Sequence, residues 1–387
     1  MKILSIFGTR PEAIKMAPVI HELLRHSNQI TSRVCVTGQH REMLDQMLGF
    51  FGIRSDYDLN PMQTQQSLSS LTSLTLLNLQ NVLEDFQPDW IIVQGDTTTA
   101  FASALAAFYK RIKIAHVEAG LRTYNLHSPW PEEANRHLAS VLCDAHYAPT
   151  QESVNNLLAE RAPSHTIVKT GNTVIDALKW VIAKIDQKPE LKNALAQQYS
   201  FLSPDKRLIL VTGHRRENWE SGLRRMFEGL KAIAQRDDVE IIYPVHLNPI
   251  VLNQAQAILQ NQPNIFLVEP ADYLAFIYLM QRCTLIVTDS GGVQEEAPTF
   301  GKPVLVTRDT TERPEAVHAG TAKLVGTDST VIKNEITRLL DDPIAYQQMS
   351  TAHNPFGDGQ ASRRIVKDLL TRSTEPSKLH KLVESQT

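Results

Sequence analysis

Cysteine is rare in this sequence: only Cys35, Cys143 and Cys283 occur among 387 residues. The three are far apart, each lies in an apolar stretch, and no cysteine or histidine stands at a spacing typical of a metal site. This pattern argues against a disulfide-stabilised secreted domain and against a structural zinc site. We therefore expect buried free thiols, a reducing compartment and no bound metal.

Long apolar runs, repeats and an excess of one charge are also lacking. No apolar run approaches the ~18 residues of a membrane-spanning helix. Only five residues separate Lys2 from Gly8, too few for the apolar part of a signal peptide. The net charge of −3 gives no general attraction to nucleic acid or membranes, so an anionic ligand would need a local site. We expect a cytoplasmic protein that binds neither nucleic acid nor membranes.

What the sequence does contain is a regular alternation of strands and helices. The length of 387 residues, with 42% hydrophobic and 21% charged residues, fits two soluble domains of ordinary size. Alternation of this kind favours α/β domains with doubly wound parallel sheets. Strands are expected near residues 2–7, 33–37, 89–94, 113–117, 146–148 and 166–169, and then near 208–212, 240–244, 265–268, 285–288 and 303–306.

A polar segment divides the two series of strands. Residues 186–206 contain Pro189 and Pro204 and are interpreted as a linker between a domain at 1–185 and a second at 207–359. A last helix at 360–371 could cross back to the first domain, and the polar tail 372–387 is expected to be loose.

The segment LIVTDSGGVQEEAP, residues 285–298, is the most informative part of the chain. An apolar strand runs into Ser290, Gly291 and Gly292, and a helix follows at once. Two glycines let the backbone approach a ligand, and the free N–H groups of a helix start attract an anion. Glu296 lies where it could accept a hydrogen bond from a sugar hydroxyl. A tight turn whose acids stabilise the helix dipole explains the segment alone equally well.

A second segment of this type stands at the N-terminus. Residues 2–7 form a predicted strand, residues 8–12 a turn, and residues 13 to about 24 an amphipathic helix. Arg10 therefore lies at a strand–helix junction, where open α/β sheets bind ligands. Two phosphate-type junctions so far apart in the sequence suggest two halves that face one ligand.

Acidic residues follow other strands of the first half. Asp96 follows one strand, Glu118 follows the next, and Glu132 and Glu133 open a helix that also carries Arg136. Three acids at the ends of strands would suit proton transfer. Helix capping could explain Asp96, and dipole stabilisation with an exposed Glu132–Arg136 pair could explain the helix. Glu118 is harder to explain structurally, because an acid that ends an apolar strand needs a partner or a ligand.

Basic residues follow two strands of the second half. His214 and Arg215 come just after the strand at 208–212, and His246 follows the strand at 240–244. We expect His214 to contact a phosphate or to give a proton to a leaving phosphate. The support for His246 is weaker.

Two further positions allow either a functional or a structural interpretation. Arg308 and Arg313 follow the last predicted strand and could close over an anion, or they could be solvated charges in a loop. Phe276 is most simply a core aromatic, although its ring could stack on a base.

Ordered motifs over roughly residues 1–365 carry a resemblance to a known family. They are GTRPEAIKMAP, TGQHREMLDQ, GDTTT, HVEAGLRT, SPWPEEANR, TGNTVIDAL, GHRREN, YPVHLNP, TDSGGVQEEAP, GKPVL and RDTTERPEA. With them the chain resembles the bacterial non-hydrolysing UDP-N-acetylglucosamine 2-epimerases. The resemblance implies a GT-B fold of two Rossmann-like domains, an active site in the cleft between them, and a homodimer. It also implies that UDP-GlcNAc and UDP-ManNAc are interconverted without a nicotinamide cofactor, for cell-surface polysaccharide synthesis. The chain has no GxGxxG motif after its first strand.

The resemblance also implies roles for matching residues. The residues that hold UDP would be Arg10, His214, Ser290, Gly291, Gly292 and Glu296. Those around the sugar would be Asp96, Glu118, Glu132 and Arg136, with Lys15 and Arg313 in supporting electrostatic roles. Some relatives bind a second, activating UDP-GlcNAc, which here would involve Gln39, His40, Arg215 and His246. Residues 60–66 lack the arginine that certain relatives carry, so a second site would be weaker.

The implied mechanism removes UDP and adds it back. A carboxylate takes the C2 proton as UDP leaves C1, 2-acetamidoglucal remains, and reprotonation on the other face precedes re-addition. Three alternatives stay open: a hydrolysing epimerase, a GT-B glycosyltransferase, and a non-catalytic UDP-sugar sensor.

Overall fold

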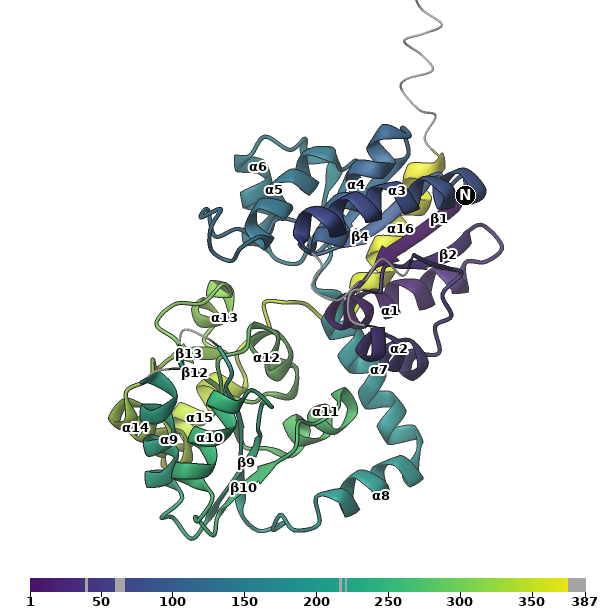
Figure 1. Ribbon diagram of the computed structural model, residues 1–387. Helices are drawn as coiled ribbons and strands as arrows, with labels where there is room; N and C mark the ends of the chain where they lie inside the picture. Colours follow the sequence, from purple (N-terminus) through teal and green to yellow (C-terminus); the bar gives the residue numbers. More distant parts are fainter. Residues whose placement is uncertain (39–40, 60–66, 216–217, 220, 375–387) are drawn as a thin grey trace, which may run out of the picture. The chain divides into compact units, whose positions relative to one another are not determined.

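The computed structural model of the protein describes residues 1–38, 41–59, 67–215, 218–219 and 221–374. It divides into two compact units, Met1–Ala177 with Phe356–Thr387, and Leu178–Pro355. Each unit has one parallel sheet with helices packed on it (Figure 1). The α/β fold class with doubly wound parallel sheets is confirmed.

The first unit contains a seven-stranded sheet in the order β3-β2-β1-β4-β5-β6-β7. Every recorded strand pair in it is parallel. The strands are β1 (Lys2–Phe7), β2 (Thr31–Val36), β3 (Tyr57–Asp58), β4 (Trp90–Gln94), β5 (Lys113–Val117), β6 (Ala145–Ala148) and β7 (Ile167–Lys169). The short β3 was not predicted. The central strands β1, β4 and β5 are almost wholly buried, as a parallel sheet covered on both faces requires.

Helices cover this sheet in two groups. Among the described residues they are α1 (Arg10–Arg25), α2 (Arg41–Phe51), α3 (Leu68–Phe86), α4 (Thr98–Tyr109), α5 (Glu132–Leu142), α6 (Gln151–Ala159), α7 (Thr173–Gln187) and α16 (Ala361–Thr374). Helices α3, α4 and α5 pack side by side, and α1 packs on α2 and on α16 (Figure 1). The start of α16 is tied to α7, because Asp176 Oδ1 accepts a hydrogen bond from Ser362 N at 2.8 Å.

The second unit contains a six-stranded parallel sheet in the order β10-β9-β8-β11-β12-β13. Its strands are β8 (Arg207–Thr212), β9 (Val239–Pro244), β10 (Ile265–Val268), β11 (Leu285–Thr288), β12 (Val304–Val306) and β13 (Ala322–Leu324). Its helices are α8 (Pro189–Gln198), α9 (Gly222–Ile233), α10 (Pro249–Leu259), α11 (Tyr273–Arg282), α12 (Gly291–Glu296), α13 (Pro314–His318), α14 (Ser329–Asp341) and α15 (Pro343–Ser350).

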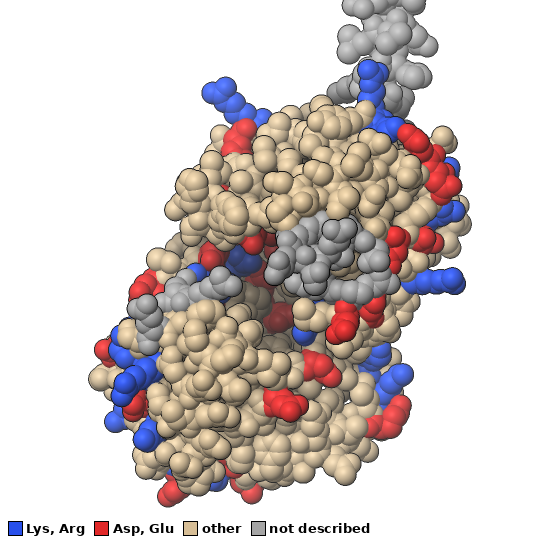
Figure 2. Space-filling view, in the orientation of Figure 1, with Lys and Arg blue, Asp and Glu red and all other residues tan. Residues whose placement is uncertain are grey.

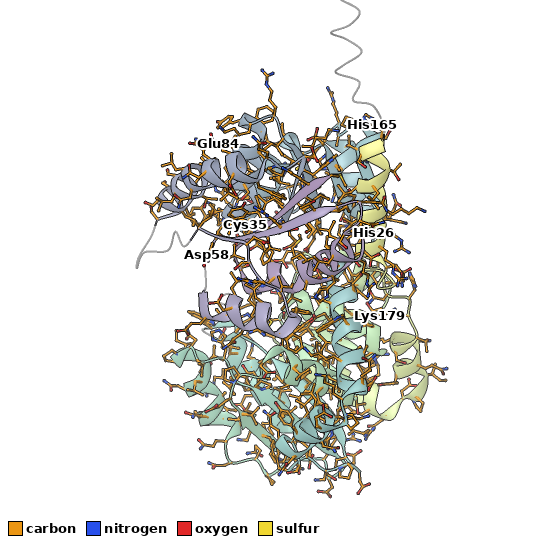
Figure 3. All side chains as sticks on the ribbon, turned by 90° about the vertical axis from the view of Figure 1, so that its right-hand side faces the viewer. His26, Cys35, Asp58, Glu84, His165 and Lys179 are labelled. Carbon is orange, nitrogen blue, oxygen red and sulfur yellow. The ribbon has the colours of Figure 1, made fainter. Side chains whose placement is uncertain are left out.

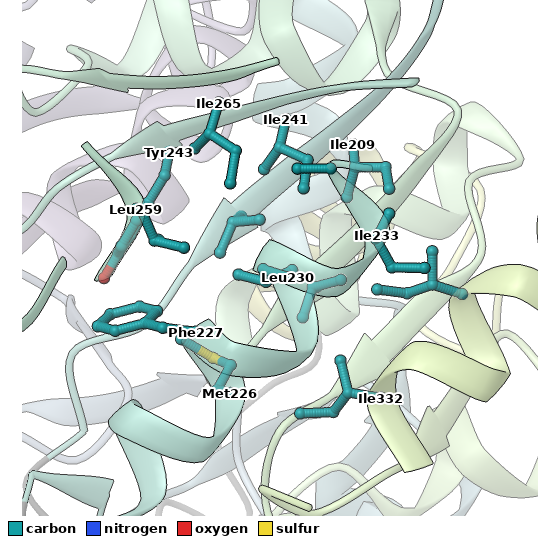
Figure 4. Close-up of a cluster of buried hydrophobic side chains, with 14 of the residues drawn as sticks. Ile209, Met226, Phe227, Leu230, Ile233, Ile241, Tyr243, Leu259, Ile265 and Ile332 are labelled. Atoms are coloured by element: carbon teal, nitrogen blue, oxygen red, sulfur yellow. The ribbon is translucent and has the colours of Figure 1, made fainter. Parts of the chain in front are cut away.

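The core of the second unit forms where α9 lies on the sheet (Figure 4). Phe227 and Leu230 are wholly buried, and they face strand residues that include Ile241 and Tyr243. The spacing of three along the helix places both side chains on one face. Burying this face removes apolar surface from water and fixes the helix on the sheet.

The segment interpreted as a linker has its own structure. Residues 186–206 include α8, and Tyr199 and Leu202 after it are buried. Arg282 of α11 donates to the carbonyl oxygen of Leu202 at 2.7 Å. The compact units divide at 177/178, inside α7, and at 355/356 rather than at 185 and 359.

The cysteines are all free thiols, as expected. Burial raises the pKa of Cys35, on β2 (Figure 3), and of Cys283 to about 12, so both stay protonated. Cys143 is only half-buried, whereas all three cysteines were expected to be buried. In the described part of the chain, no helix is long and apolar enough to cross a membrane. Acidic and basic side chains are interspersed on the face shown in Figure 2.

Candidate active site

The junction of β1 and α1 is built around a buried carboxylate. Thr9 caps the helix, so α1 begins at Arg10. The sequence pattern predicted a turn at residues 8–12 and the start of the helix at residue 13. Glu12 Oε2 accepts hydrogen bonds from Gly8 N at 3.0 Å and from Thr9 N at 2.8 Å. Its Oε1 accepts from the hydroxyl of Thr97, which follows β4, at 2.7 Å. Glu12 therefore joins the turn that carries Arg10 to the turn after β4.

Burial dominates the electrostatics of Glu12. The residue is 2% exposed. Desolvation raises the pKa of its carboxyl, and hydrogen bonds from Thr97, Thr9 and Gly8 oppose the rise without cancelling it. The carboxyl of Glu12 is therefore easier to protonate than an ordinary one.

Glu118 directly follows β5 and has a strained backbone conformation. Its φ angle is 64°, in the left-handed region that residues other than glycine rarely adopt. Lys15 Nζ lies 2.7 Å from Oε1 and 2.6 Å from Oε2, and Gln94 Nε2 also donates to Oε2. The side chain of Glu118 is only 5% exposed. Backbone strain of this type gathers at functional sites, so a charged carboxylate held here favours a role in binding or catalysis.

Asp96 is held by the start of α5. Arg136 donates to its Oδ2 through Nε at 2.9 Å and Nη2 at 2.6 Å. Asn135 Nδ2 donates to the Asp96 carbonyl oxygen at 2.9 Å. The helix-capping interpretation of Asp96 is wrong, because the side chain that caps α4 belongs to Thr97.

The two glutamates that open α5 have different environments. Glu133 is 0% exposed and Arg136 is 8% exposed, and they pair at 2.7 Å. The interpretation of Glu132–Arg136 as an exposed ion pair is therefore wrong. Burial alone would raise the pKa of Glu133, but hydrogen bonds from Thr123, Arg136 and Tyr124 outweigh it and hold the pKa below its ordinary value. Glu132 is half-buried and has no hydrogen-bond partner within the described ranges.

Three of the predicted site residues lie at one edge of the first sheet. Arg10, Asp96 and Glu118 follow β1, β4 and β5, which are neighbours in the strand order. Parallel strands end at the same edge, which is where open α/β sheets bind ligands. His116, on β5, donates from Nε2 to Gly95 O at 2.7 Å, and burial lowers the pKa of its ring to about 4, so the ring stays neutral.

In the second unit a buried aspartate shapes the turn after β8. Asp289 is 0% exposed, and its Oδ2 accepts from His214 N and Arg215 N, each at 2.8 Å. His214 Nδ1 lies 3.6 Å from Oδ1, too far for a hydrogen bond but within reach of charge attraction. Burial lowers the pKa of His214 most, Asp289 opposes this, and His246 adds to it.

His214 and His246 are brought together as a stacked pair. Their ring centroids lie 5.3 Å apart with planes inclined by 10°. Asn248 N donates to His246 Nδ1 at 3.1 Å, so Nε2 of the exposed ring is directed away from the backbone. Arg215 is half-buried beside them. Gln39, His40 and residues 60–66, which complete the predicted second site, lie outside the described residues.

The glycines after β11 leave open space above the backbone. Gly291 and Gly292 do not have positive φ angles, so the turn itself does not require glycine. A Cβ added at Gly291 would meet no atom closer than the guanidinium of Arg313 at 3.8 Å, and one added at Gly292 would meet Ser290 Oγ at 3.9 Å. This geometry favours close approach of a ligand over a tight structural turn.

The other predicted residues of the second unit have different surroundings. Glu296 is 7% exposed, and its Oε1 accepts from the Tyr273 hydroxyl at 3.1 Å. Arg313 Nε donates to Glu295 Oε1. Phe276 is half-buried on α11. Within the described part of the chain, no group of three or more His, Cys, Asp or Glu residues could hold a metal ion.

Comparison with known proteins decides the family. Residues 22–370 match the model of the UDP-N-acetylglucosamine 2-epimerase family. The UDP-N-acetylglucosamine 2-epimerase of Yersinia pestis is 56% identical over 370 residues, which cover 95% of this chain and 98% of that protein. The enzyme of Escherichia coli K12 is 55% identical with the same coverage. The chain belongs to this family. It is therefore an isomerase, and the resemblance found in its motifs is confirmed.

Solved structures agree with this assignment. A Neisseria meningitidis UDP-GlcNAc 2-epimerase bound to UDP-GlcNAc has a TM-score of 0.89 and 52% identity, with 96% of this chain and all of that chain covered (100%). The Methanocaldococcus jannaschii enzyme in complex with UDP-GlcNAc and UDP has a TM-score of 0.78 and 32% identity, with 96% and 100% covered. A Rickettsia africae glycosyltransferase, 14% identical with a TM-score of 0.63, shows the fold alone. The two-domain GT-B-like architecture is confirmed.

Four supporting residues of the site were not predicted. Glu12, Gln94, His116 and Asp289 each contact a predicted residue or the turn beside it. The signal for Glu12 was present as the capping box Thr9-x-x-Glu12. Gln94 and His116 interrupt otherwise apolar strands, and a buried polar side chain there needs a partner.

Proposed function

We propose that the protein interconverts UDP-GlcNAc and UDP-ManNAc by removing UDP and adding it back. The observation that carries this proposal is the pair of carboxylates at the edge of the first sheet, Asp96 and Glu118, together with helix α5, which begins at Glu132 and pairs with Asp96 through Arg136. Each of the three acids has a different charge environment: Arg136 faces Asp96, Lys15 faces Glu118, and Glu132 has no cation partner within the described ranges. Acid–base pairs in enzymes are distinguished by such differences.

The chemistry explains why several acids are needed. A carboxylate removes the C2 proton, the C1–O bond to UDP breaks, and the electron pair of the C2–H bond forms the C1=C2 bond of 2-acetamidoglucal. The negative charge moves to the diphosphate. A proton is then delivered to the opposite face of C2 and UDP adds again to C1. Two faces require two acid–base groups, one on each side of the sugar.

The basic residues would stabilise the leaving UDP. Arg10, His214 and the backbone amides at Ser290–Gly292 are the groups that we assign to the diphosphate, where they lower the energy of the developing charge. The open space above Gly291 and the guanidinium of Arg313 beside it support this assignment. Glu296 is assigned to the ribose, since it combines burial with an oxygen that can accept a hydroxyl hydrogen bond.

The proposal is tested by solvent exchange at C2. In D2O with UDP-GlcNAc and no added NAD, NMR should show UDP-ManNAc that carries deuterium at C2. The same mixture should form from UDP-ManNAc. Protium retained at C2 would rule out proton removal. Free ManNAc would indicate a hydrolysing enzyme, transfer to an added sugar would indicate a glycosyltransferase, and binding without turnover would indicate a sensor.

A homodimer is part of the proposal. Helices α3, α4 and α5 pack side by side and carry exposed apolar residues, among them Leu77, Phe108, Leu138 and Val141, of which Val141 is 85% exposed. An apolar surface spread over adjacent helices is typical of a contact between proteins. Light scattering after size exclusion should give twice the chain mass of 43.4 kDa, and Val141→Glu should give the monomer. A monomeric parent protein would contradict this.

A further inference from the structure

Glu133 is the most enclosed acid at the predicted sugar site. It is 0% exposed, and four donors surround it. Its Oε1 accepts from Thr123 N and Tyr124 N, each at 2.9 Å, and lies 3.2 Å from His137 Nε2. Its Oε2 accepts from Arg136 Nη1 at 2.7 Å. An acid that only stabilised the helix dipole would remain in water, because burying a charge is costly unless it is fully paired.

The partner of Glu133 connects it to Asp96. Arg136 uses Nη1 for Glu133 and uses Nε (2.9 Å) and Nη2 (2.6 Å) for Asp96 Oδ2. The guanidinium is planar and its donors have a fixed geometry. Fixing Nη1 therefore orients the edge that holds the Asp96 carboxylate.

A second ion-paired group lies on the other side of Glu133. His137 Nδ1 is 3.2 Å from Glu160 Oε1, and Arg122 binds Glu160 with two hydrogen bonds of 2.7 Å. No recorded bond joins Glu160 to Arg136 or Asp96. Glu160 thus belongs to the same network but has no direct path to the predicted catalytic acid.

We propose that Glu133 is a positioning residue that acts through Arg136 to hold the carboxylate of Asp96 in place. The inference rests on the proposed role of Asp96. Glu133 also fixes the loop after Glu118, because its Oε1 binds the amides of Thr123 and Tyr124. Tyr124 adopts a φ angle of 58°, so this loop depends on an anchor to keep its conformation.

Glu133→Gln is a sharp test because every contact of Glu133 is with a donor. If the amide oxygen of the new Gln keeps the hydrogen bonds from Thr123 N and Tyr124 N, its amide nitrogen faces Arg136 Nη1. Both of these groups are donors, so no hydrogen bond can form between them. Arg136 should then lose its fixed orientation. A displacement of about 1 Å near the reacting groups can lower a rate about 100-fold. We expect kcat to fall at least about tenfold while KM for UDP-GlcNAc changes less than about threefold.

The matched control is Glu160→Gln. It removes a carboxylate from the same network on the side away from Asp96, so kcat should stay within about twofold of the parent value. A double-mutant cycle tests whether Glu133 acts through Asp96. In the Asp96→Asn variant, adding Glu133→Gln should lower kcat by less than about threefold relative to Asp96→Asn alone. A full, multiplicative loss there would overturn the proposal.

A spectroscopic readout keeps this test separate from the proposed function. The Nε–H of Arg136 donates to Asp96 in the parent protein and should exchange slowly with solvent in 1H–15N spectra. Protection should be lost in Glu133→Gln and kept in Glu160→Gln. Unchanged protection in Glu133→Gln would overturn the inference even if the protein did not epimerise UDP-GlcNAc. Lack of C2 exchange in the parent protein would instead overturn the function.

If the Glu133→Gln variant does not fold, Glu133→Asp provides the alternative test of the proposal. It keeps the charge but withdraws the carboxylate by one methylene, so Arg136 should be held less firmly and kcat should fall by an intermediate amount. Parent values of both kcat and Nε–H protection in Glu133→Asp would contradict the inference.

Discussion

Substitutions of Glu12 test how much the hydrogen bonds of this buried carboxylate contribute to the stability of the protein. Its carboxylate accepts from Gly8 N, Thr9 N and Thr97 Oγ1 at 2.7–3.0 Å while only 2% exposed. Glu12→Gln can keep the oxygen on the two backbone amides and donate from its nitrogen to Thr97 Oγ1. Glu12→Ala loses all three contacts. We expect the two variants to differ strongly in stability.

The size of the difference follows from the donors that are left unpaired. A buried amide without a partner costs ~1–3 kcal/mol. Two such amides, at Gly8 and Thr9, give a loss of about 2–5 kcal/mol in the free energy of unfolding for Glu12→Ala, after allowance for water that enters the vacated space. Glu12→Gln should stay within about 1 kcal/mol of the parent protein, because its hydrogen bonds can be reformed.

The pH dependence of stability separates the two forms of Glu12 further. Burial raises its pKa above the ordinary value of 4.5, so the fold favours the protonated carboxyl. The resulting stabilisation is fully present below pH 4.5 and is lost as the pH rises through the raised pKa. Gln cannot titrate, so the parent protein should gain stability relative to Glu12→Gln as the pH is lowered through that window.

Urea denaturation followed by circular dichroism, at several pH values, measures both effects. Thr97→Ser keeps the hydroxyl and serves as the control, with stability near that of the parent protein. The reasoning would be refuted if Glu12→Gln were as damaging as Glu12→Ala, or if the difference between Glu12→Gln and the parent were the same at every pH.

Three other expectations concern activity, binding and packing. Asp96→Asn, Glu118→Gln and Glu132→Gln should each lower kcat ~100-fold or more with UDP affinity largely kept; normal turnover by all three would mean that their roles are structural. Glu296→Ala should weaken UDP binding by ~1.5–3 kcal/mol in calorimetry, and unchanged affinity would remove it from the site. Phe227→Ala should cost the second unit about 3–5 kcal/mol in urea denaturation, because the ring is 0% exposed in the core; a smaller loss would mean that the core repacks.

Most of the fold could be predicted because buried parallel strands appear as short apolar runs. The strands at 2–7, 113–117, 265–268 and 285–288 were predicted with the bounds that the structure has. The strands β3 and β13 were missed, since two or three residues of mixed polarity carry no periodic signal. Their place in the sheets depends on backbone pairing with β2 and β12.

The segment at 186–206 shows where polarity misleads. It was interpreted as a linker, yet it contains the ten-residue helix α8. Pro189 stands at the first position of that helix, where proline is well tolerated, and does not interrupt it. Leu195 is buried and packs the helix against the rest of the protein. The polar average composition of the segment does not reveal this single apolar contact.

The strand-end positions of the proposed site residues were easier to predict than the contacts of their side chains. A strand end followed by Asp96 or His214 is visible in the sequence, and the sheet order then brings such ends together. The partners of these residues come from distant elements: Arg136 lies 40 positions from Asp96, and Asp289 lies 75 positions from His214. Spacing in one sequence does not contain that information.

Glu132 and Glu133 show most clearly what a single sequence cannot predict about side-chain surroundings. Adjacent residues of a helix with 3.6 residues per turn project about 100° apart, so two neighbouring side chains can have very different surroundings. In α5 the inward direction belongs to Glu133, which is 0% exposed and surrounded by donors, while Glu132 stays half-buried. A carboxylate that accepts four donors is poorly suited to exchange a proton, and one without such partners can. We therefore propose different roles for these two neighbouring glutamates: Glu133 holds the site in place, and Glu132 takes part in its chemistry.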